Sequence, residues 1–71
     1  MDNIFEPPEC PFKIGQLVID KYFPDAGIML VLEMTWKVAY LEWELRLLSQ
    51  QTGRIYYLNP VDLQAAEEYD E

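Results

Sequence analysis

Two carboxylates, Glu42 and Glu44, are two residues apart, a spacing that places both side chains on one face of a strand. Such a pair can help to hold a hard cation, or can act as general acid and base when an apolar pocket raises the pKa of one member. Neither use finds support in the neighbouring sequence, because no Gly-rich loop or further acid lies beside them. We therefore expect a solvated face without a metal, on which Glu44 also pairs weakly with Arg46.

Cys10 is the only thiol of the chain, and its neighbours argue against a role as a nucleophile. An activated thiol needs a nearby base or cation, whereas Cys10 lies between Glu9 and Pro11. The chain has no histidine, the usual general base near neutral pH and the commonest metal ligand. Its three glycines form no phosphate-binding loop. We predict that the protein is not an enzyme and that it uses no cofactor.

Aromatic side chains are more informative, because two Trp, five Tyr and three Phe exceed what the core of a 71-residue chain can hold. Tyr56 and Tyr57 would point to opposite faces of one strand, so at least one lies outside the core. Trp and Tyr anchor protein interfaces, whereas base stacking would need a basic groove that five scattered basic residues do not form. Core packing and an interface both stay open. For an interface, the residues that we expect to bind a partner are Tyr40, Glu42, Trp43, Glu44, Tyr56 and Tyr57.

Both tryptophans fall in the stretch 36–48, whose conformation decides the fold class. From Leu41 to Leu47 apolar residues alternate strictly with charged ones, the pattern of a strand with one wet face. A helix between Thr35 as N-cap and Gly53 is the alternative. It would carry two apolar stripes, so most of its surface would be apolar, more than so short a chain can bury. We favour the strand.

Turn signals divide the remaining chain into short strands, which we expect at 17–22, 27–35, 54–58 and 63–66. The turns are expected at 24–27, 50–53 and 59–62, the last as a single 3₁₀ turn. Trp36 and Lys37 would form a sharp connection between the second and third strands. The near-continuous hydrophobicity of the second strand indicates burial on both sides.

The chain divides into three parts by composition. Residues 1–11 form an extended arm, since three prolines within five positions exclude a helix. Residues 12–66 form the folded domain, and residues 67–71, with four acids, form a solvated tail. The chain is 51% hydrophobic, which favours one folded domain over disorder.

Thirteen acids against five bases give a net charge of −8, which repels nucleic acid and anionic membranes. No apolar run approaches the length of a membrane span. The first residues lack the basic and apolar regions of a signal peptide. A single cysteine excludes an internal disulfide and suits a reducing compartment. We expect a cytoplasmic protein with no membrane partner.

Five short strands, the last two separated by a one-turn connection, describe an SH3-like barrel. The opening at 12–18 (FKIGQLV) resembles that of many SH3-like barrels, and 27–33 (GIMLVLE) resembles their second strand. Residues 52–58 (TGRIYYL), followed by Asp62 and Leu63, resemble their closing pattern. Short proteins of this type are common in phage genomes. The resemblance implies an all-β, five-stranded SH3-like barrel with a Pro-rich arm and an acidic tail.

The opening also resembles KOW-type modules and the hemimethylated-DNA-binding heat shock family. KOW modules that bind RNA are basic, whereas this chain is acidic. The heat shock family typically has a histidine after the opening, where this chain has Ile19 and Asp20. The resemblance therefore implies a fold and no binding residues.

We predict a non-enzymatic protein-interaction module, with a phage accessory protein that binds and modulates a host protein as one form of it. Two alternatives stay open. One is an acidic inhibitor that imitates nucleic acid, with affinity that falls steeply with salt. The other is a structural subunit of a virion or other assembly. The oligomeric state also stays open, and a homodimer is one of its possibilities.

Overall fold

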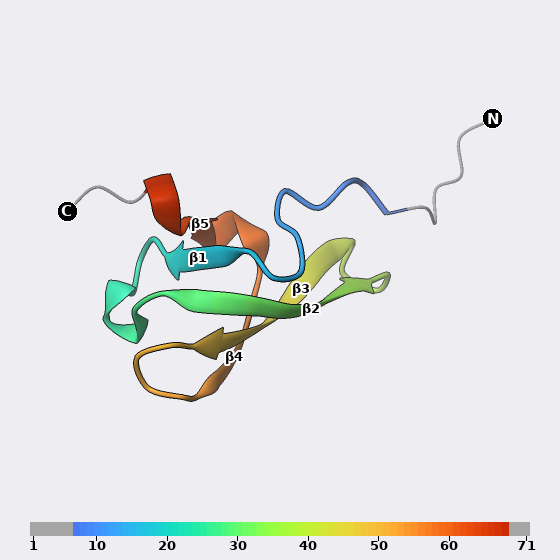
Figure 1. Ribbon diagram of the computed structural model, residues 1–71. Helices are drawn as coiled ribbons and strands as arrows, with labels where there is room; N and C mark the ends of the chain where they lie inside the picture. The colour runs from blue at the N-terminus through green and yellow to red at the C-terminus, as the bar shows by residue number, and fades with distance from the viewer. Residues whose placement is uncertain (1–6, 69–71) are drawn as a thin grey trace.

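Figure 1 shows the computed structural model, which describes residues 7–68. Its five strands are β1 (Leu17–Asp20), β2 (Met29–Lys37), β3 (Glu42–Ser49), β4 (Ile55–Leu58) and β5 (Leu63–Ala65). All pairings are antiparallel within one sheet of order β4-β3-β2-β1-β5, so the last strand returns to the first. This confirms the all-β prediction, including strand rather than helix in the central stretch. Residues 1–6 of the predicted arm and 69–71 of the predicted tail lie outside the described residues.

The connection predicted at Trp36 and Lys37 is wrong, because both residues belong to β2. Trp36 lies opposite Trp43 and Lys37 opposite Glu42, and an aromatic pair and a pair of opposite charges both favour continued strand pairing. The chain turns instead at 38–41. Leu41 therefore lies in the turn, outside the alternation that was expected to begin with it.

The register of β2 against β3 shifts between Val31 and Glu33. Val31 lies opposite Leu47 and Glu33 opposite Arg46, so Leu32 is the extra residue of a β-bulge. Because side chains alternate between faces, one extra residue exchanges the faces for the rest of the strand. The bulge therefore places Trp36 on the same face as Trp43.

The core lies on one face of the sheet, called here the inner face; the opposite face is called the outer face. Phe12 and Ala26 lie at the margin of the core. Its centre is formed by fully buried side chains from three adjacent strands: Val18, Met29, Val31, Leu45 and Leu47. The prediction that the second strand is buried on both sides is wrong. Ile28 is exposed, and Leu30 and Leu32 are half-buried. The reason is that no second layer covers the outer face within residues 7–68.

Three one-turn 3₁₀ segments connect or follow the strands: η1 (Pro24–Ala26), η2 (Pro60–Asp62) and η3 (Ala66–Glu68). The first two confirm the turns predicted at 24–27 and 59–62, and Asn59 caps η2 by accepting a hydrogen bond from the Val61 amide. β1 ends earlier than expected because the Asp20 carboxylate accepts hydrogen bonds from the amides of Tyr22 and Phe23, which turns the chain.

No helix among the described residues is long and apolar enough to cross a membrane.

Candidate functional site

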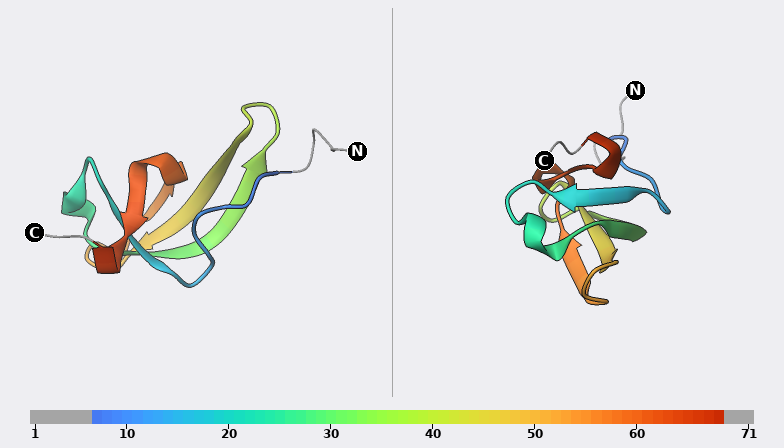
Figure 2. Two further views of the ribbon diagram at one scale, coloured as in Figure 1. Left: turned by 90° about the horizontal axis from the view of Figure 1, so that it is seen from above. Right: turned by 60° about the vertical axis from the view of Figure 1, so that its left-hand side comes forward.

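The β2–β3 hairpin extends beyond the strands on either side of it. β1 pairs with β2 at Met29 and Leu30, and β4 pairs with β3 from Leu45 to Leu48. Residues 33–44 therefore form a two-stranded projection, whose turn points away from β5 in Figure 2. We call this part of the chain the projecting hairpin.

The turn of the projecting hairpin consists of four apolar residues, 38–41. The exposed fractions are 51% for Val38, 75% for Tyr40 and 69% for Leu41. Leu41 has a φ of 52°, in the left-handed region that glycine and asparagine normally occupy. That conformation costs a leucine about 1 kcal/mol or more, and the exposed side chain recovers little of this by burial. The stability of the fold does not account for these residues, which we call the apolar tip.

Charged side chains flank the apolar tip on the outer face of the hairpin. Glu42 is exposed and accepts a hydrogen bond of 2.8 Å from Nδ2 of Asn59. Glu44 forms an ion pair of 3.5 Å with Nζ of Lys37. The predicted pairing of Glu44 with Arg46 is therefore replaced by a cross-strand pair, because Lys37 is a diagonal neighbour of Glu44 on the adjacent strand.

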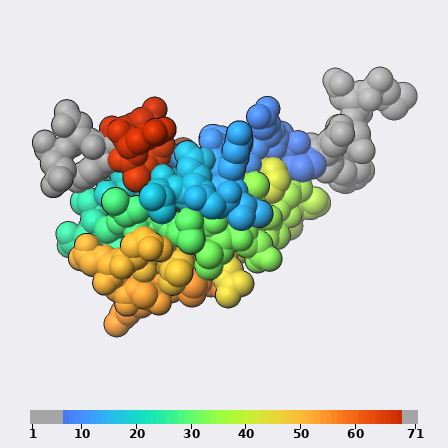
Figure 3. All heavy atoms as spheres, in the orientation of Figure 1, coloured from blue at the N-terminus to red at the C-terminus, as the bar shows by residue number. Residues whose placement is uncertain are grey.

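The inner face of the projecting hairpin carries both tryptophans. Their ring centroids are 5.4 Å apart and their planes are inclined at 65°, an edge-to-face arrangement. Trp43 Nε1 donates a hydrogen bond of 3.0 Å to the carbonyl oxygen of Pro8. Trp36 Nε1 is buried and has no acceptor among residues 7–68. In Figure 3 the arm (blue) lies against the end of this hairpin (green and yellow).

The two tyrosines of β4 lie apart from the apolar tip. Tyr56 is opposite Leu47 and packs half-buried against the core. Tyr57 is opposite Arg46 and is exposed on the outer face. The six residues expected to bind a partner thus do not form one patch. The projecting hairpin gathers four of them, Tyr40, Glu42, Trp43 and Glu44, whereas Tyr57 lies further along the outer face and Tyr56 lies on the core side.

Two apolar features were not predicted from the sequence. One is the apolar tip: the stretch 36–48, which contains Val38 and Leu41, is expected to be a strand that follows a connection at Trp36 and Lys37. The other is a row of aliphatic residues in register across four strands of the outer face, called here the outer row: Leu17, Leu30, Leu48 and Ile55. Adjacent apolar residues such as those at 17–18 and 47–48 were the available signal, because one of each pair must face outward.

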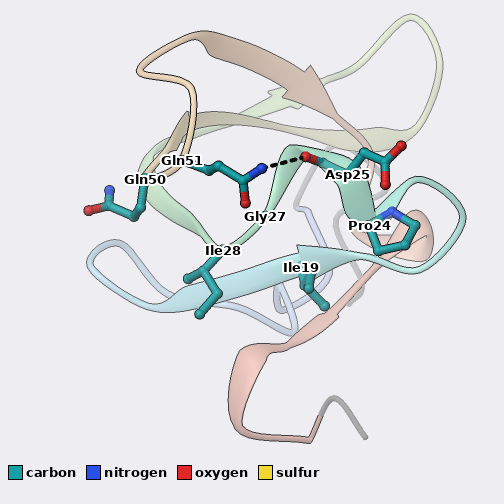
Figure 4. Close-up of a pocket in the computed structure, with 7 residues that line it drawn as sticks. All are labelled: Ile19, Pro24, Asp25, Gly27, Ile28, Gln50 and Gln51. Carbon is teal, nitrogen blue, oxygen red and sulfur yellow. Dashed lines mark hydrogen bonds between the residues drawn. The ribbon is translucent and has the colours of Figure 1, made fainter. Parts of the chain in front are cut away.

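A hollow at the other end of the molecule is lined by residues that include Ile19, Asp25, Ile28 and Gln51 (Figure 4). Gln51 Nε2 donates a hydrogen bond of 3.4 Å to the carbonyl oxygen of Asp25 and so spans one side of it. The lining offers one carboxylate, two amides and two isoleucines. No group of three His, Cys, Asp or Glu residues able to hold a metal ion occurs within residues 7–68. The groups that line the hollow provide hydrogen bonds and apolar contact.

The sequence matches no protein-family model and no curated protein, and no solved structure matches the chain.

Proposed function

We propose that this protein is a small, non-enzymatic interaction module that binds a protein partner through the projecting hairpin. The observation that carries the proposal is the apolar tip, where Val38, Tyr40 and Leu41 are exposed and Leu41 adopts a strained conformation. Strained backbone and exposed apolar side chains are retained where they are used for binding. The sheet would serve as a rigid base that presents this hairpin.

The partner would offer an apolar pocket with a basic rim. The three exposed side chains of the apolar tip suit such a pocket, and the Tyr40 hydroxyl can form a hydrogen bond at its edge. Glu42 and Lys37 both lie next to the tip, so the preference for a basic rim rests on the charge of −8 that the whole chain carries. Basic groups around the pocket would therefore speed association.

We further propose that the sheet is an SH3-like barrel. The return of β5 to β1 and the single 3₁₀ turn between β4 and β5 support this assignment. A phage origin and a host protein as partner rest on the resemblance of 12–18, 27–33 and 52–58 to SH3-like barrels, since short proteins of that type are common in phage genomes. A cytoplasmic location is proposed from the single cysteine, which suits a reducing compartment.

Capture from a cytosolic lysate, with steps of rising salt and then denaturant, tests the interaction. We expect the unmodified chain to capture one protein that stays bound as the salt concentration rises. Tyr40→Ser should capture at least tenfold less of this protein. Tyr22→Ser is the matched control, because Tyr22 is equally exposed, at 75%, and lies outside the hairpin. Equal capture by both variants, with circular dichroism confirming their folds, would refute the role of the tip.

An assembly subunit is the second candidate, and the outer row favours it. These four aliphatic residues lie on an uncovered sheet face and can bury area against another subunit. Self-association that Leu48→Lys abolishes, measured by sedimentation velocity, would support this role.

The nucleic-acid mimic has less support, because Lys37 and Arg46 interrupt the acids on the outer face of the hairpin. A nucleic-acid enzyme released by moderate salt in the capture experiment would favour it.

A further inference from the structure

β4 is one edge of the sheet within residues 7–68, because it pairs with β3 alone. Natural proteins protect such an edge with a charged residue, a proline or a bulge, since its free backbone groups readily pair with another strand. β4 has none of these, because its four residues (IYYL) are apolar or aromatic and its register with β3 is continuous. With the turn at 50–53, β4 (gold to orange) lies at the lower rim of the molecule in Figure 3.

The other edge of the described sheet, β5, is protected by its length and its neighbours. It has three residues, with η2 directly before it and η3 directly after it. Very short edge strands are one of the devices that prevent unwanted pairing. Within residues 7–68, β4 is therefore the edge that is open to another strand.

The hydrogen bonds between β3 and β4 determine which backbone groups of β4 are free. The amide of Ser49 donates a hydrogen bond of 2.9 Å to the carbonyl oxygen of Arg54, so these residues form a hydrogen-bonded pair. Such pairs occur at every second position of an antiparallel ladder. Tyr56 therefore directs its amide and carbonyl towards β3, whereas its neighbours Ile55 and Tyr57 direct theirs away from the sheet.

This spacing makes the edge complementary to itself. When β4 of a second copy runs antiparallel to it about a two-fold axis at Tyr56, Ile55 of each copy lies opposite Tyr57 of the other, and their outward amides and carbonyls pair. The side chains of Ile55 and Tyr57 are 39% and 59% exposed, both on the outer face. Each pair would thus join a β-branched and an aromatic side chain, a combination that stabilises adjacent strands.

We propose that β4 is a dimer interface, which joins two copies of this chain into one continuous antiparallel sheet with Tyr56 on the two-fold axis. The interface lies on a different surface from the projecting hairpin and the outer row, and it does not depend on the proposed function. It gives a role to Tyr56 and Tyr57, which lie apart from the apolar tip. Because each copy has one open edge within residues 7–68, pairing ends at two copies.

The charges near β4 permit this pairing although each copy carries −8. β4 has no acid, and two of the five basic residues adjoin it: Arg54 precedes it, and Arg46 lies opposite Tyr57. The repulsion between two copies therefore comes from charges outside the interface, which salt screens. The dimer should become tighter as the salt concentration rises, whereas an association held by ion pairs would become weaker.

Sedimentation velocity of the full chain over a range of protein concentrations tests the dimer. Tyr57→Pro removes an amide that does not donate to β3, and proline is tolerated in an edge strand at such a position. We expect it to weaken dimerisation at least about tenfold. Tyr57→Val is the matched control, because it keeps the amide and should weaken dimerisation less than about threefold. Circular dichroism verifies that both variants fold.

Leu48→Lys separates edge pairing from association through the outer row, and it should dimerise like the unmodified chain. A chain that stays monomeric at every concentration would overturn the proposal. So would a dimer that persists in Tyr57→Pro, a dimer that Leu48→Lys abolishes, or association that continues beyond two copies. A monomer that still captures a lysate protein in a manner dependent on Tyr40 would refute the dimer and leave the proposed function in place.

Disulfide formation tests the register directly, and it decides the proposal even if Tyr57→Pro does not fold. The background is Cys10→Ser, which removes the native thiol. The two copies of residue 56 would form a non-hydrogen-bonded pair with Cα atoms about 4.5 Å apart, within the range of a disulfide. The two copies of residue 55 would be diagonal neighbours about 7–8 Å apart, beyond that range. On oxidation, Tyr56→Cys should give at least about fivefold more disulfide-linked dimer than Ile55→Cys, and equal yields would overturn the proposal.

Discussion

Ser49 and Ala26 are joined by a short hydrogen bond: Ser49 Oγ donates to the carbonyl oxygen of Ala26 at 2.6 Å, across 23 positions of sequence. Ser49 Oγ also accepts hydrogen bonds from the amides of Gln51 and Thr52, at 3.2 and 3.0 Å. One buried hydroxyl therefore connects the end of β3, the η1 turn and the turn at 50–53. This end of the sheet, opposite the projecting hairpin, depends on it.

Ser49→Ala should lower the free energy of unfolding by about 2–3 kcal/mol, because it leaves a buried carbonyl and two amides without their partner. Urea denaturation followed by tryptophan fluorescence measures the loss. Thr52→Ala is the control, since its Oγ1 accepts one exposed hydrogen bond from the amide of Arg54 and should cost less than about 0.5 kcal/mol. Equal losses in the two variants would contradict this account of Ser49.

Gly27→Ala should destabilise the fold more than Gly53→Ala. Both glycines have a positive φ, of 73° and 75°. Gly27 combines it with a ψ of −163°, a backbone region that is essentially restricted to glycine. A Cβ on Gly27 would in addition lie 2.8 Å from Oε1 and 3.0 Å from Cβ of Gln51, whereas one on Gly53 would meet nothing within 4 Å. The difference between the two midpoints of urea unfolding measures the cost of this backbone region together with that of the contact with Gln51, and a difference of zero would contradict the prediction.

The tryptophans should respond differently to replacement by phenylalanine. Trp36→Phe removes a buried N–H that has no acceptor within residues 7–68, which offsets the smaller ring and keeps the free energy of unfolding within about 0.5 kcal/mol. Trp43→Phe removes the donor to Pro8 and should cost about 1 kcal/mol. Chemical denaturation of both variants tests this order, and a larger loss for Trp36→Phe would disprove it.

Leu41→Gly should raise the free energy of unfolding by up to about 1 kcal/mol and weaken partner capture, since it relieves the positive φ and removes a side chain of the apolar tip. Val38→Gly is the control, because Val38 does not have a positive φ and its replacement should give no gain in stability. Thermal unfolding and lysate capture are measured on the same samples. A stabilised variant with undiminished capture would remove Leu41 from the binding surface.

Several elements of the fold follow from a few adjacent residues. The alternation at 42–47 predicts a strand because side-chain direction in a strand has a period of two. Pro24 with Gly27, and Asn59 with Pro60, predict turns because proline restricts φ and glycine permits positive φ. These preferences act within one turn or one strand, so no knowledge of distant contacts is needed.

Other features depend on contacts between distant segments. The hairpin turns at 38–41 without a glycine, because the pairing of Trp36 with Trp43 extends the two strands past the point at which local signals would end them. The bulge at Leu32 exchanges the faces of β2, and a one-residue shift of register leaves no mark in composition. The hydrogen bond from Trp43 to Pro8 likewise joins residues 35 positions apart. Local sequence thus specifies where the backbone extends or turns, whereas register and the meeting of distant segments depend on packing across the whole sheet.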